Sequence, residues 1–586
     1  MKKIATALLI FAASLQLPAL TILTGPTFTP ANNAPLAGTL SLTSDRVTRV
    51  QVSVTNDNGS WQRDFYDYGT NHSLTLLGFK PNQTNNITVR VFDRTRHAYT
   101  SPTNLQFITA PLPAAMPKMI LVTNNPELME PGYTLFRVAN NTTGAAYVTM
   151  VDNAGQIVWY SVLPTPSDVR QLSNGDLFFP DTSEAGFTEA NMLGATVRTW
   201  TAPAGYLVDS HEDLQTDHGT ILYINYTKRV ITNFPTAIRS NAPLASVNAN
   251  VNRVVEMSIT NSTLLNSWSL IDLLDPQRVD YLTYRVAFYG TDPEHANAVI
   301  EDHRDNSLIV SLRNQDAVIK ISRATGQLKW ILGPPENWGP QWQQYLLTPV
   351  GSPFAWQYGQ HAPMLTPQGT LLMYDDGNCR AEPFDPALPD NENYSRGVEY
   401  SIDETNMQVS QVWEYTGGNE DRLYVDEVGN ATWLPQRNNV LLTFGHVTYE
   451  NGLSVSSATT NASMVRIKEV THDADPSVVF DLEIFDPTNH SPTYAGNLVY
   501  RSYRVPDLYT HPATPVTDLT FNVIGGKLVL RFTADPARSY SIESSDDLNT
   551  WTPAGVPTPD DDIGDYSYLP GANGSPPAQF YRVITQ

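Results

Sequence analysis

The sequence contains little cysteine and little positive charge, and it has no long apolar run after its first residues. Its single cysteine, Cys379, has no partner for an intrachain disulfide, so the fold must be stabilised by packing. Its 36 lysines and arginines are outnumbered by 59 aspartates and glutamates, which gives a net charge of −23. Because the phosphates of nucleic acid would be repelled, we expect no nucleic-acid partner. No later segment approaches ~20 consecutive apolar residues, so we expect no membrane span.

The amino terminus has the composition of a targeting signal. Two lysines precede a short apolar run over residues 4–13, as in secretory signals. We predict a signal peptide over residues 1–20, with cleavage within residues 13–22. The protein is therefore expected to be periplasmic or secreted.

The overall composition indicates a globular protein built mainly from strands. Hydrophobic residues make up 41% of the chain and charged residues 16%, which is enough apolar material for a large core. The 43 prolines and 34 glycines favour many short strands and turns over long helices. We therefore expect an all-β protein, and a chain of 586 residues is too long for a single core.

Residues 24–112 are predicted to form a small β-sandwich. Polar and apolar residues alternate, as in half-buried strands, in three segments: 38–44, 47–54 and 86–92. Residues 76–89 resemble the corner before a late strand in fibronectin type III domains, so we expect a fibronectin III-like sandwich. A proline-rich linker over residues 110–117 follows it.

Residues 118–512 contain internal repeats. A strand that ends in an aromatic or apolar residue recurs six times, at residues 155–159, 194–200, 264–268, 326–330, 409–413 and 478–484. Six such units predict a six-bladed β-propeller, with seven blades as the main alternative. We expect residues 497–505 to complete a blade that begins near residue 118 and thereby to close the ring.

Residues 515–586 are predicted to form a separate small β-module. Its strand-like segments are 527–532, 540–545, 551–553 and 579–584. We find no chemistry in this module and expect a structural or attachment role.

Three histidines occupy the same place in the repeated unit. His211, His295 and His361 each precede a short strand, a polar turn and a second apolar strand. A repeat that returns one side-chain type to one place would bring the three imidazoles together near a common axis. This recurrence favours a site over three unrelated turn residues. Three other histidines of the repeats are interpreted as turn or strand-end residues: His218, His303 and His446.

The segments that contain these histidines carry a family resemblance. Residues 295–297, 311–321 and 325–333, with Gln360-His361, residues 374–380 and His211, resemble the bacterial aryl-sulfate sulfotransferase family. The resemblance covers residues 24–512. It implies an exported six-bladed propeller with an amino-terminal β-sandwich that moves a sulfuryl group between phenols without a nucleotide sulfate donor.

The resemblance also implies roles for individual residues. It implies a covalent sulfohistidine on His361 and a hydroxyl residue in the site, for which Thr432 is the match. The disulfide that the family places shortly after the nucleophile's blade cannot form within this chain, because Cys379 is the only cysteine of the sequence.

The chemistry of sulfuryl transfer points to the same residues. A neutral imidazole is a good nucleophile near neutral pH, and His361 is the candidate. Arg313 offers a planar, permanently charged fork of donors to the sulfuryl oxygens. Asn297 lies two residues after His295, so in a strand both point to one face, and its amide can donate to a sulfuryl oxygen. Either His211 or His295 could protonate the departing phenolate, and the sequence leaves that choice open.

The expected ligands are an aryl sulfate donor and a phenolic acceptor, with no metal or other cofactor. Arg380 is a candidate for the pocket rim, with a structural ion pair as the alternative reading. Two other functions remain open: a hydrolase that holds a metal with three histidines, which Arg313 would oppose by repelling a cation, and a non-catalytic propeller that binds a surface or glycan. The oligomeric state also stays open, a homo-oligomer included.

Overall fold

The computed structural model describes residues 19–585 apart from several short segments. Those segments are residues 94–97, 102–104, 141–143, 163–167, 182–184, 210, 285–289, 419–420, 451–452, 457–462, 486–495, 510–516, 525–526, 535–538, 560–564 and 571–579. Residues 1–18, which contain most of the predicted signal peptide, also lie outside the described part. The described residues form strands and two short 3-10 helices, so the predicted all-β class is confirmed. None of the helices found in them is long and apolar enough to cross a bilayer.

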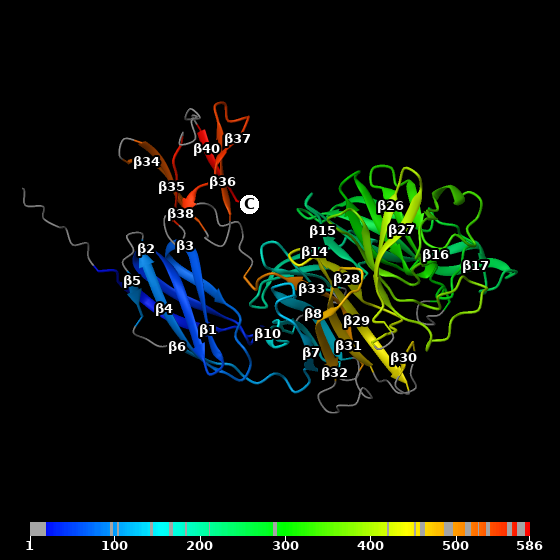
Figure 1. The fold of residues 1–586 in the computed structure, drawn as a ribbon, viewed down its shortest axis with the longest axis horizontal. Helices are drawn as coiled ribbons and strands as arrows, with labels where there is room; N and C mark the ends of the chain where they lie inside the picture. Colours follow the sequence, from blue (N-terminus) through cyan, green and yellow to red (C-terminus); the bar gives the residue numbers. More distant parts are fainter. Residues whose placement is uncertain are drawn as a thin grey trace, which may run out of the picture.

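The amino-terminal sheet is organised by one long strand. Its members are β1 (Ile22–Pro30), β2 (Gly38–Asn56), β3 (Gly59–Leu76), β4 (Thr84–Asp93), β5 (Ala98–Thr100) and β6 (Leu105–Ile108) (Figure 1). β2 contains both segments expected as separate strands, joined across a register shift between Thr43 and Thr48. β3 pairs along one edge of β2, while β1 and β4 pair with the first and second parts of its other edge.

Six further sheets, named first to sixth here, are built from residues 118–505 (Figure 1). The first contains β33 (Asn497–Val505), β8 (Tyr133–Asn140), β9 (Ala146–Val151) and β10 (Ile157–Ser161). The second contains β11 (Arg170–Gln171), β12 (Leu177–Asp181), β13 (Gly186–Ala190) and β14 (Thr196–Thr201). The third contains β15 (Asp213–Gln215), β16 (Thr220–Pro235), β17 (Leu244–Ser258) and β18 (Leu264–Ser269).

The remaining three sheets follow the same order. The fourth contains β19 (Ala296–Asp302), β20 (Ser307–Leu312), β21 (Ala317–Ser322) and β22 (Leu328–Leu332). The fifth contains β24 (His361–Leu365), β25 (Leu371–Asp375), β26 (Arg396–Asp403), β27 (Gln408–Tyr415) and the short β23 (Thr348–Pro349). The sixth contains β28 (Asn430–Leu434), β29 (Asn439–Glu450), β31 (Ser463–Thr471), β32 (Val478–Phe485) and β7 (Lys118–Asn124), with β30 (Leu453–Val455) paired to β29.

Each sheet packs against the next, and the sixth packs against the first. The indole of Trp159 donates to the carbonyl of Met192 in the second sheet, and that of Trp200 donates to the carbonyl of Ile259 beside the third. β16 contacts β19, β19 contacts β24, β24 contacts β28, and β28 and β29 contact β33. The repeated strands predicted from their aromatic or apolar ends are β10, β14, β18, β22, β27 and β32, which are the fourth strands of their sheets.

The expected closure between residues 118 and 497–505 was wrong in its pairing. β7 pairs with β32 of the sixth sheet, while β33 pairs with β8 of the first sheet. The two chain segments therefore lie in different sheets. The sequence pattern identifies strands, but the partner of a strand depends on contacts between distant residues.

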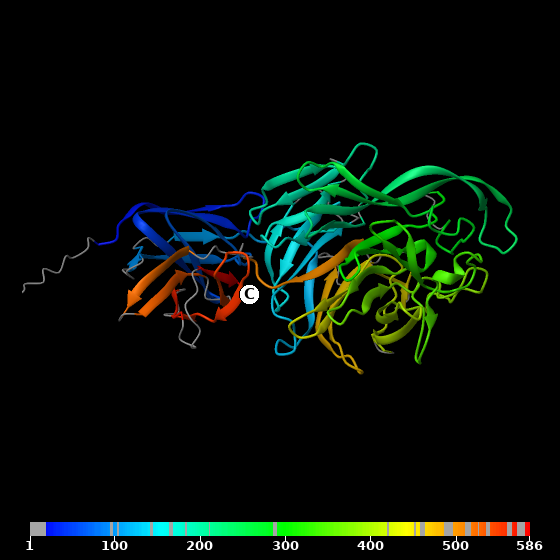
Figure 2. The same cartoon turned by 90° about the horizontal axis from the view of Figure 1, so that it is seen from above.

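The amino-terminal sheet and the first sheet share contacts, whereas the carboxy-terminal module has a core of its own. Arg63 pairs with Asp507, and the Tyr509 hydroxyl bonds to the backbone of Leu77. The module contains two sheets, made of β34 (Thr517–Ile524), β35 (Lys527–Thr533), β38 (Thr558–Pro559) and β39 (Asp565–Tyr568), and of β36 (Tyr540–Ser545), β37 (Thr552–Gly555) and β40 (Phe580–Thr585). It lies next to the amino-terminal sheet in both ribbon views (Figures 1 and 2).

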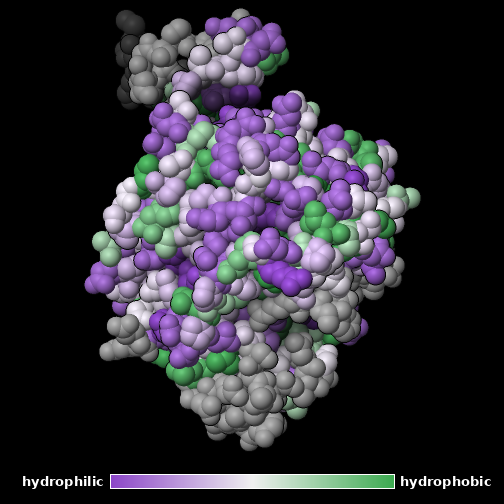
Figure 3. Space-filling view, turned by 90° about the vertical axis from the view of Figure 1, so that its right-hand side faces the viewer, coloured by the Kyte–Doolittle hydropathy of each residue, from purple (hydrophilic) through white to green (hydrophobic). Residues whose placement is uncertain are grey.

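One face of the six-sheet body looks away from the amino-terminal sheet and the carboxy-terminal module. This face is largely hydrophilic (Figure 3).

Candidate functional site

Two of the three repeated histidines lie together at the start of their sheets. His211 precedes β15 and His295 precedes β19, and their ring centroids are 4.9 Å apart. Nδ1 of His211 lies 2.5 Å from Asp209 Oδ1, and Nδ1 of His295 lies 2.6 Å from Asp292 Oδ2. A carboxylate at Nδ1 fixes each ring and leaves Nε2 for another partner.

The carboxylates also control the charge of His211. Burial disfavours its imidazolium, but the negative charges of Asp209 and Asp292 outweigh burial and raise the pKa of His211 above its ordinary value. His211 is therefore suited to carry a proton that it can give to a substrate oxygen.

His361 is the most deeply buried of the three histidines. It is the first residue of β24, it is 2% exposed, and its Nδ1 lies 3.0 Å from Asp376 Oδ1. Burial and the nearby charge of Arg313 lower the pKa of His361 well below its ordinary value. Its imidazole is therefore neutral near pH 7, as an attacking nitrogen must be.

Asp376 shares this buried environment. Burial raises the pKa of its carboxyl well above the ordinary value, while Arg313 acts in the opposite direction. When Asp376 is ionised it accepts a hydrogen bond from Nδ1 of His361, which leaves the lone pair on Nε2. Arg313 thus favours the carboxylate form that orients the nucleophile.

Arg313 begins the short helix η1 (Arg313–Gln315) directly after β20. Its backbone N–H donates to the carbonyl of His295 at 3.1 Å, and its Nη2 donates to the carbonyl of Asp426 at 2.7 Å. The residue is 6% exposed, and within the described structure its Nε has no hydrogen-bond partner. The hydrogen bond to Asp426 fixes the Arg313 guanidinium, and its buried Nε–H remains available as a donor. Such a guanidinium is suited to bind an anion.

Asn297 joins the fourth and fifth sheets. Its Nδ2 donates at 2.8 Å to the carbonyl of Gln360, the residue before His361. Its Oδ1 is buried and has no hydrogen-bond partner among the described residues. One amide hydrogen therefore positions the His361 backbone, and the other remains for the predicted contact with a sulfuryl oxygen.

The last two predicted site residues, Thr432 and Arg380, make contacts with neighbouring side chains. Thr432 is half-buried in β28, and its hydroxyl accepts a hydrogen bond from Asn430 Nδ2 at 2.8 Å. Arg380 pairs with Asp375 at 3.1 Å and stacks on Tyr394, with 3.9 Å from its guanidinium carbon to the ring centroid. Arg380 therefore matches the alternative reading of a structural ion pair.

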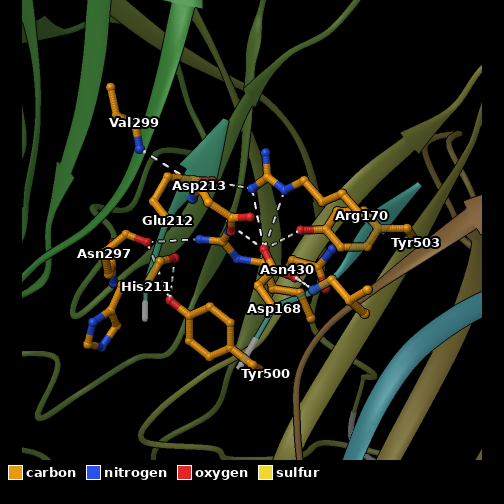
Figure 4. Close-up of polar contacts among 12 residues, drawn as sticks. Asp168, Arg170, His211, Glu212, Asp213, Asn297, Val299, Asn430, Tyr500 and Tyr503 are labelled. Carbon is orange, nitrogen blue, oxygen red and sulfur yellow. Dashed lines mark hydrogen bonds and ion pairs between the residues drawn. The ribbon is translucent and has the colours of Figure 1, made fainter. Parts of the chain in front are cut away.

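Tyr500 and Arg501 of β33 were missed in the sequence but contact the site. The Tyr500 ring lies edge-on to His211 and to His361, at centroid distances of 5.9 Å and 6.4 Å. Its hydroxyl donates to the carbonyl of His211 at 3.1 Å (Figure 4). Arg501 Nη2 donates to the carbonyl of Asn297 at 2.8 Å. No local motif marks these two residues, because β33 reaches the site only through the closure of the sheets.

A group of buried charges lies behind His211. Asp168, Glu212 and Asp213 gather around the guanidinium groups of Arg170 and Arg501 (Figure 4). Burial raises the pKa of Asp213 well above its ordinary value. Glu212 directly follows His211, so this charge network holds the segment that carries the histidine.

A cavity of about 330 Å³ opens over His211 and His295. Asp209, Asp292 and Tyr226 contribute to its wall. Its lining mixes apolar and polar side chains, as the cavities that bind small ligands do. In the described part of the chain, the clusters with metal-ligand spacing lie elsewhere and are His218 with Glu301 and His303, and Asp168 with Glu212 and Asp213.

The fold and the site together describe an all-β protein in which His211 and His295 line a small cavity. The Arylsulfotransferase (ASST) family matches residues 109–494, and the chain belongs to this family. The arylsulfate sulfotransferase AssT of Escherichia coli O6:H1 is 29% identical over 333 residues, which cover 46% of this chain and 53% of that protein. The protein of the same name from Lelliottia amnigena is 28% identical over the same length and share of each chain.

The chain thus spans about half the length of the curated relatives it matches. Among solved structures, virginiamycin B lyase from Staphylococcus aureus aligns with a TM-score of 0.27 and 11% identity, covering 63% of this chain and 99% of that one. These values are too low to carry an argument.

Proposed function

We propose that the protein is an aryl-sulfate sulfotransferase that works through a sulfohistidine on His361. It takes a sulfuryl group from a phenolic sulfate ester and gives it to a phenolic acceptor, with neither a metal nor a nucleotide sulfate donor. The observation that carries this proposal is a buried, neutral His361 oriented by Asp376 and placed within the electrostatic reach of Arg313, His211 and His295. Family membership supports the same reaction.

In the first half-reaction the lone pair of His361 Nε2 attacks the sulfur of the donor. A nitrogen–sulfur bond forms while the bond between sulfur and the aryl oxygen breaks. Arg313 and the second amide hydrogen of Asn297 stabilise the charge on the sulfuryl oxygens. The departing phenolate takes a proton from His211, whose raised pKa favours the protonated form at the start.

In the second half-reaction the sulfuryl group passes from His361 to the phenolic acceptor. The phenolic oxygen attacks the sulfur and gives its proton to His211, which was left neutral by the first step. The nitrogen–sulfur bond breaks, its electron pair returns to His361 Nε2, and the sulfated phenol leaves. The proton and the imidazole are both restored, so no co-reactant is consumed.

The architecture suits this assignment. The six sheets are the blades of a six-bladed β-propeller, because each packs against the next and the sixth packs against the first. The proposed domains are a fibronectin III-like sandwich over residues 24–112, the propeller over 118–512 and the carboxy-terminal module over 515–586. The signal peptide over residues 1–20 directs the protein to the periplasm or outside the cell.

The test is a rapid-mixing assay with a chromogenic aryl sulfate and no acceptor. We expect a burst of about one phenol per chain and a sulfuryl group on His361, detectable by mass spectrometry of the matching peptide. Adding a phenolic acceptor should restore turnover without changing the burst size, because the donor half-reaction comes first. His361→Ala should remove both the burst and the label.

The matched control is His446→Ala, since His446 also bonds a carboxylate through Nδ1, that of Glu427 at 3.0 Å. This variant should keep the wild-type burst. A label that persists in His361→Ala, or turnover without any covalent species in the wild type, would contradict the mechanism.

A further inference from the structure

Two imidazoles from neighbouring sheets face each other far from the proposed transfer site. His218 lies in the turn between β15 and β16, His303 lies in the turn between β19 and β20, and their ring centroids are 5.9 Å apart. One ligand atom from each imidazole and one from the Glu301 carboxylate lie within 4.8 Å of one another. The two histidines border an open groove of about 620 Å³.

The two histidines hold equivalent places in the repeat. Each follows the first strand of its sheet, whereas His211 and His295 precede those strands. β19 contains seven residues, and at about 3.3 Å per residue its ends are roughly 20 Å apart. The cluster is therefore separate from the transfer site, although both are built by the same repetition.

The charges around the cluster favour a cation. Glu301 Oε1 accepts a hydrogen bond from Arg323, and the same guanidinium also pairs with both carboxylate oxygens of Glu256. One positive group is thus shared by two carboxylates, which leaves a net negative charge beside the imidazoles. Arg323 occupies one oxygen of Glu301, and a bound ion would use the other.

We infer that His218, His303 and Glu301 form a site for a divalent transition-metal ion, with zinc the best match. Two imidazoles and a carboxylate are ligands that zinc accepts, and water would complete a tetrahedron. With metal–ligand distances of about 2.1 Å, the ligand atoms of a tetrahedral site lie about 3.4 Å apart. In this structure the three ligand atoms lie within 4.8 Å of one another, so they would have to move closer together. Both histidines are exposed in turns, so rotation of their side chains can close this gap.

Such an ion would link the third sheet to the fourth. His218 belongs to one sheet, while His303 and Glu301 belong to the other. A ligand that binds the folded chain and not the unfolded chain stabilises the fold. The ion would therefore act on the stability of the β-sheet body rather than on the sulfuryl group.

The test is zinc titration of the full-length, metal-stripped protein by calorimetry, with cobalt absorption as a second readout. We expect the wild type to bind about one more zinc ion per chain than His218→Ala or His303→Ala, because removal of one ligand weakens the site by at least about tenfold. Cobalt should give the visible bands of a tetrahedral nitrogen and oxygen site in the wild type and in neither of these two histidine variants. The measured quantity is the difference in bound zinc between the wild type and each variant, so any zinc held by His211 and His295 contributes equally to both and does not affect the result.

The matched control is again His446→Ala, which should keep the wild-type stoichiometry and the cobalt bands. Glu301→Gln preserves the shape of the third ligand but removes its charge, and it should weaken zinc at least about tenfold. Zinc should raise the unfolding midpoint of the wild type and leave that of His218→Ala unchanged. Equal zinc binding in the wild type and in both histidine variants, or none in the wild type, would overturn the inference and leave the transferase proposal untouched.

Discussion

Each of the three repeated histidines holds a carboxylate at Nδ1. Asp209, Asp292 and Asp376 provide these carboxylates, at distances of 2.5 Å, 2.6 Å and 3.0 Å. The common pattern fixes one nitrogen of each ring, and in the proposed mechanism the other nitrogen of His361 and of His211 meets the substrate. What distinguishes the rings is charge, since the pKa of His211 is raised and that of His361 is lowered. In the proposed mechanism, one geometry thereby provides both an acid and a nucleophile.

Asp376→Asn should slow the donor half-reaction while leaving the fold intact. An amide can donate to Nδ1, which moves the proton to Nε2 and removes the attacking lone pair. We expect the single-turnover rate of phenol release to fall by about 10²–10⁴-fold, as when the orienting aspartate of a catalytic triad is replaced. Asp272→Asn, which neutralises a half-exposed carboxylate paired with Arg229, is the control and should keep the rate. A wild-type rate in Asp376→Asn would exclude an orienting role.

The pH dependence of kcat/KM should be bell-shaped with limbs on either side of 6.5, the ordinary histidine value. The pKa of His361 is lowered, so the nucleophile is lost only when pH falls well below that value. The pKa of His211 is raised, so the proton donor is lost as pH rises above it. His211→Ala should remove the alkaline limb and keep the acidic one. An alkaline limb that persists in His211→Ala would assign the acid to another group.

Much of the site was predictable from residue types and spacing, but its partners were not. His211, His295 and His361 recur at one place in the repeat, and Arg313 follows the second strand of the fourth sheet. The carboxylates at Asp209 and Asp292 lie two and three residues before their histidines and could have been noticed. Asp376 could be read equally well as part of a turn. Tyr500 could not be found, because its contact with His211 spans 289 residues.

At the scale of elements, Arg501 joins strands from several sheets. It lies on β33, and its Nη1 donates to Asp168 Oδ2 at 3.2 Å and to Glu212 Oε2 at 3.1 Å. Its Nη2 donates to the carbonyl of Asn297 in β19. One guanidinium thus fixes segments beside the second and third sheets and a strand of the fourth. It acts on the histidines as a positioning residue.

Arg501→Met should destabilise the protein strongly. The change leaves buried Asp168, Glu212 and Asp213 with Arg170 as their remaining guanidinium, and removal of one member of a buried ion pair costs about 3–5 kcal/mol. The loss is measured as a lower free energy of unfolding in urea. Arg229→Met removes a half-exposed pair with Asp272 and should cost less than about 1 kcal/mol. An equal decrease in the free energy of unfolding in the two variants would show that the buried ion pairs of Arg501 stabilise the fold no more than the half-exposed pair of Arg229.

Strands were easier to predict than their pairing. The aromatic or apolar ends identified all six fourth strands, because five of them bury a tryptophan and the sixth ends in buried apolar residues, which is a local property of the sequence. The long β2 was read as two strands, since the register shift near Thr43 interrupts its alternation. The closure through β7 and β33 was mispredicted, because either segment could pair with the other by pattern alone. Topology is a property of the whole chain.

At the scale of the whole molecule, the two flanking β-regions differ in how they attach. Apolar residues of the amino-terminal region, including Val52 of β2 and Phe79 between β3 and β4, form one continuous core with Phe136 of the first sheet and Leu441 of the sixth. The carboxy-terminal module instead buries its own apolar cluster, made of Leu530, Phe532, Ala534, Tyr540, Ile542 and Tyr566. One flanking region is thus part of the main core and the other is a separate folding unit.

Deletion of residues 515–586 should therefore leave sulfuryl transfer intact. The predicted site residues all precede residue 515, and among the described residues the module's apolar cluster includes none from the six sheets. We expect the truncated protein to show the wild-type phenol burst and an unchanged unfolding midpoint for the remaining chain. Deletion of residues 19–112 should instead expose Phe136 and Leu441 and yield little folded protein, because it removes half of a shared core. A lost burst in the first deletion, with the chain still folded by circular dichroism, would show that the module completes the site.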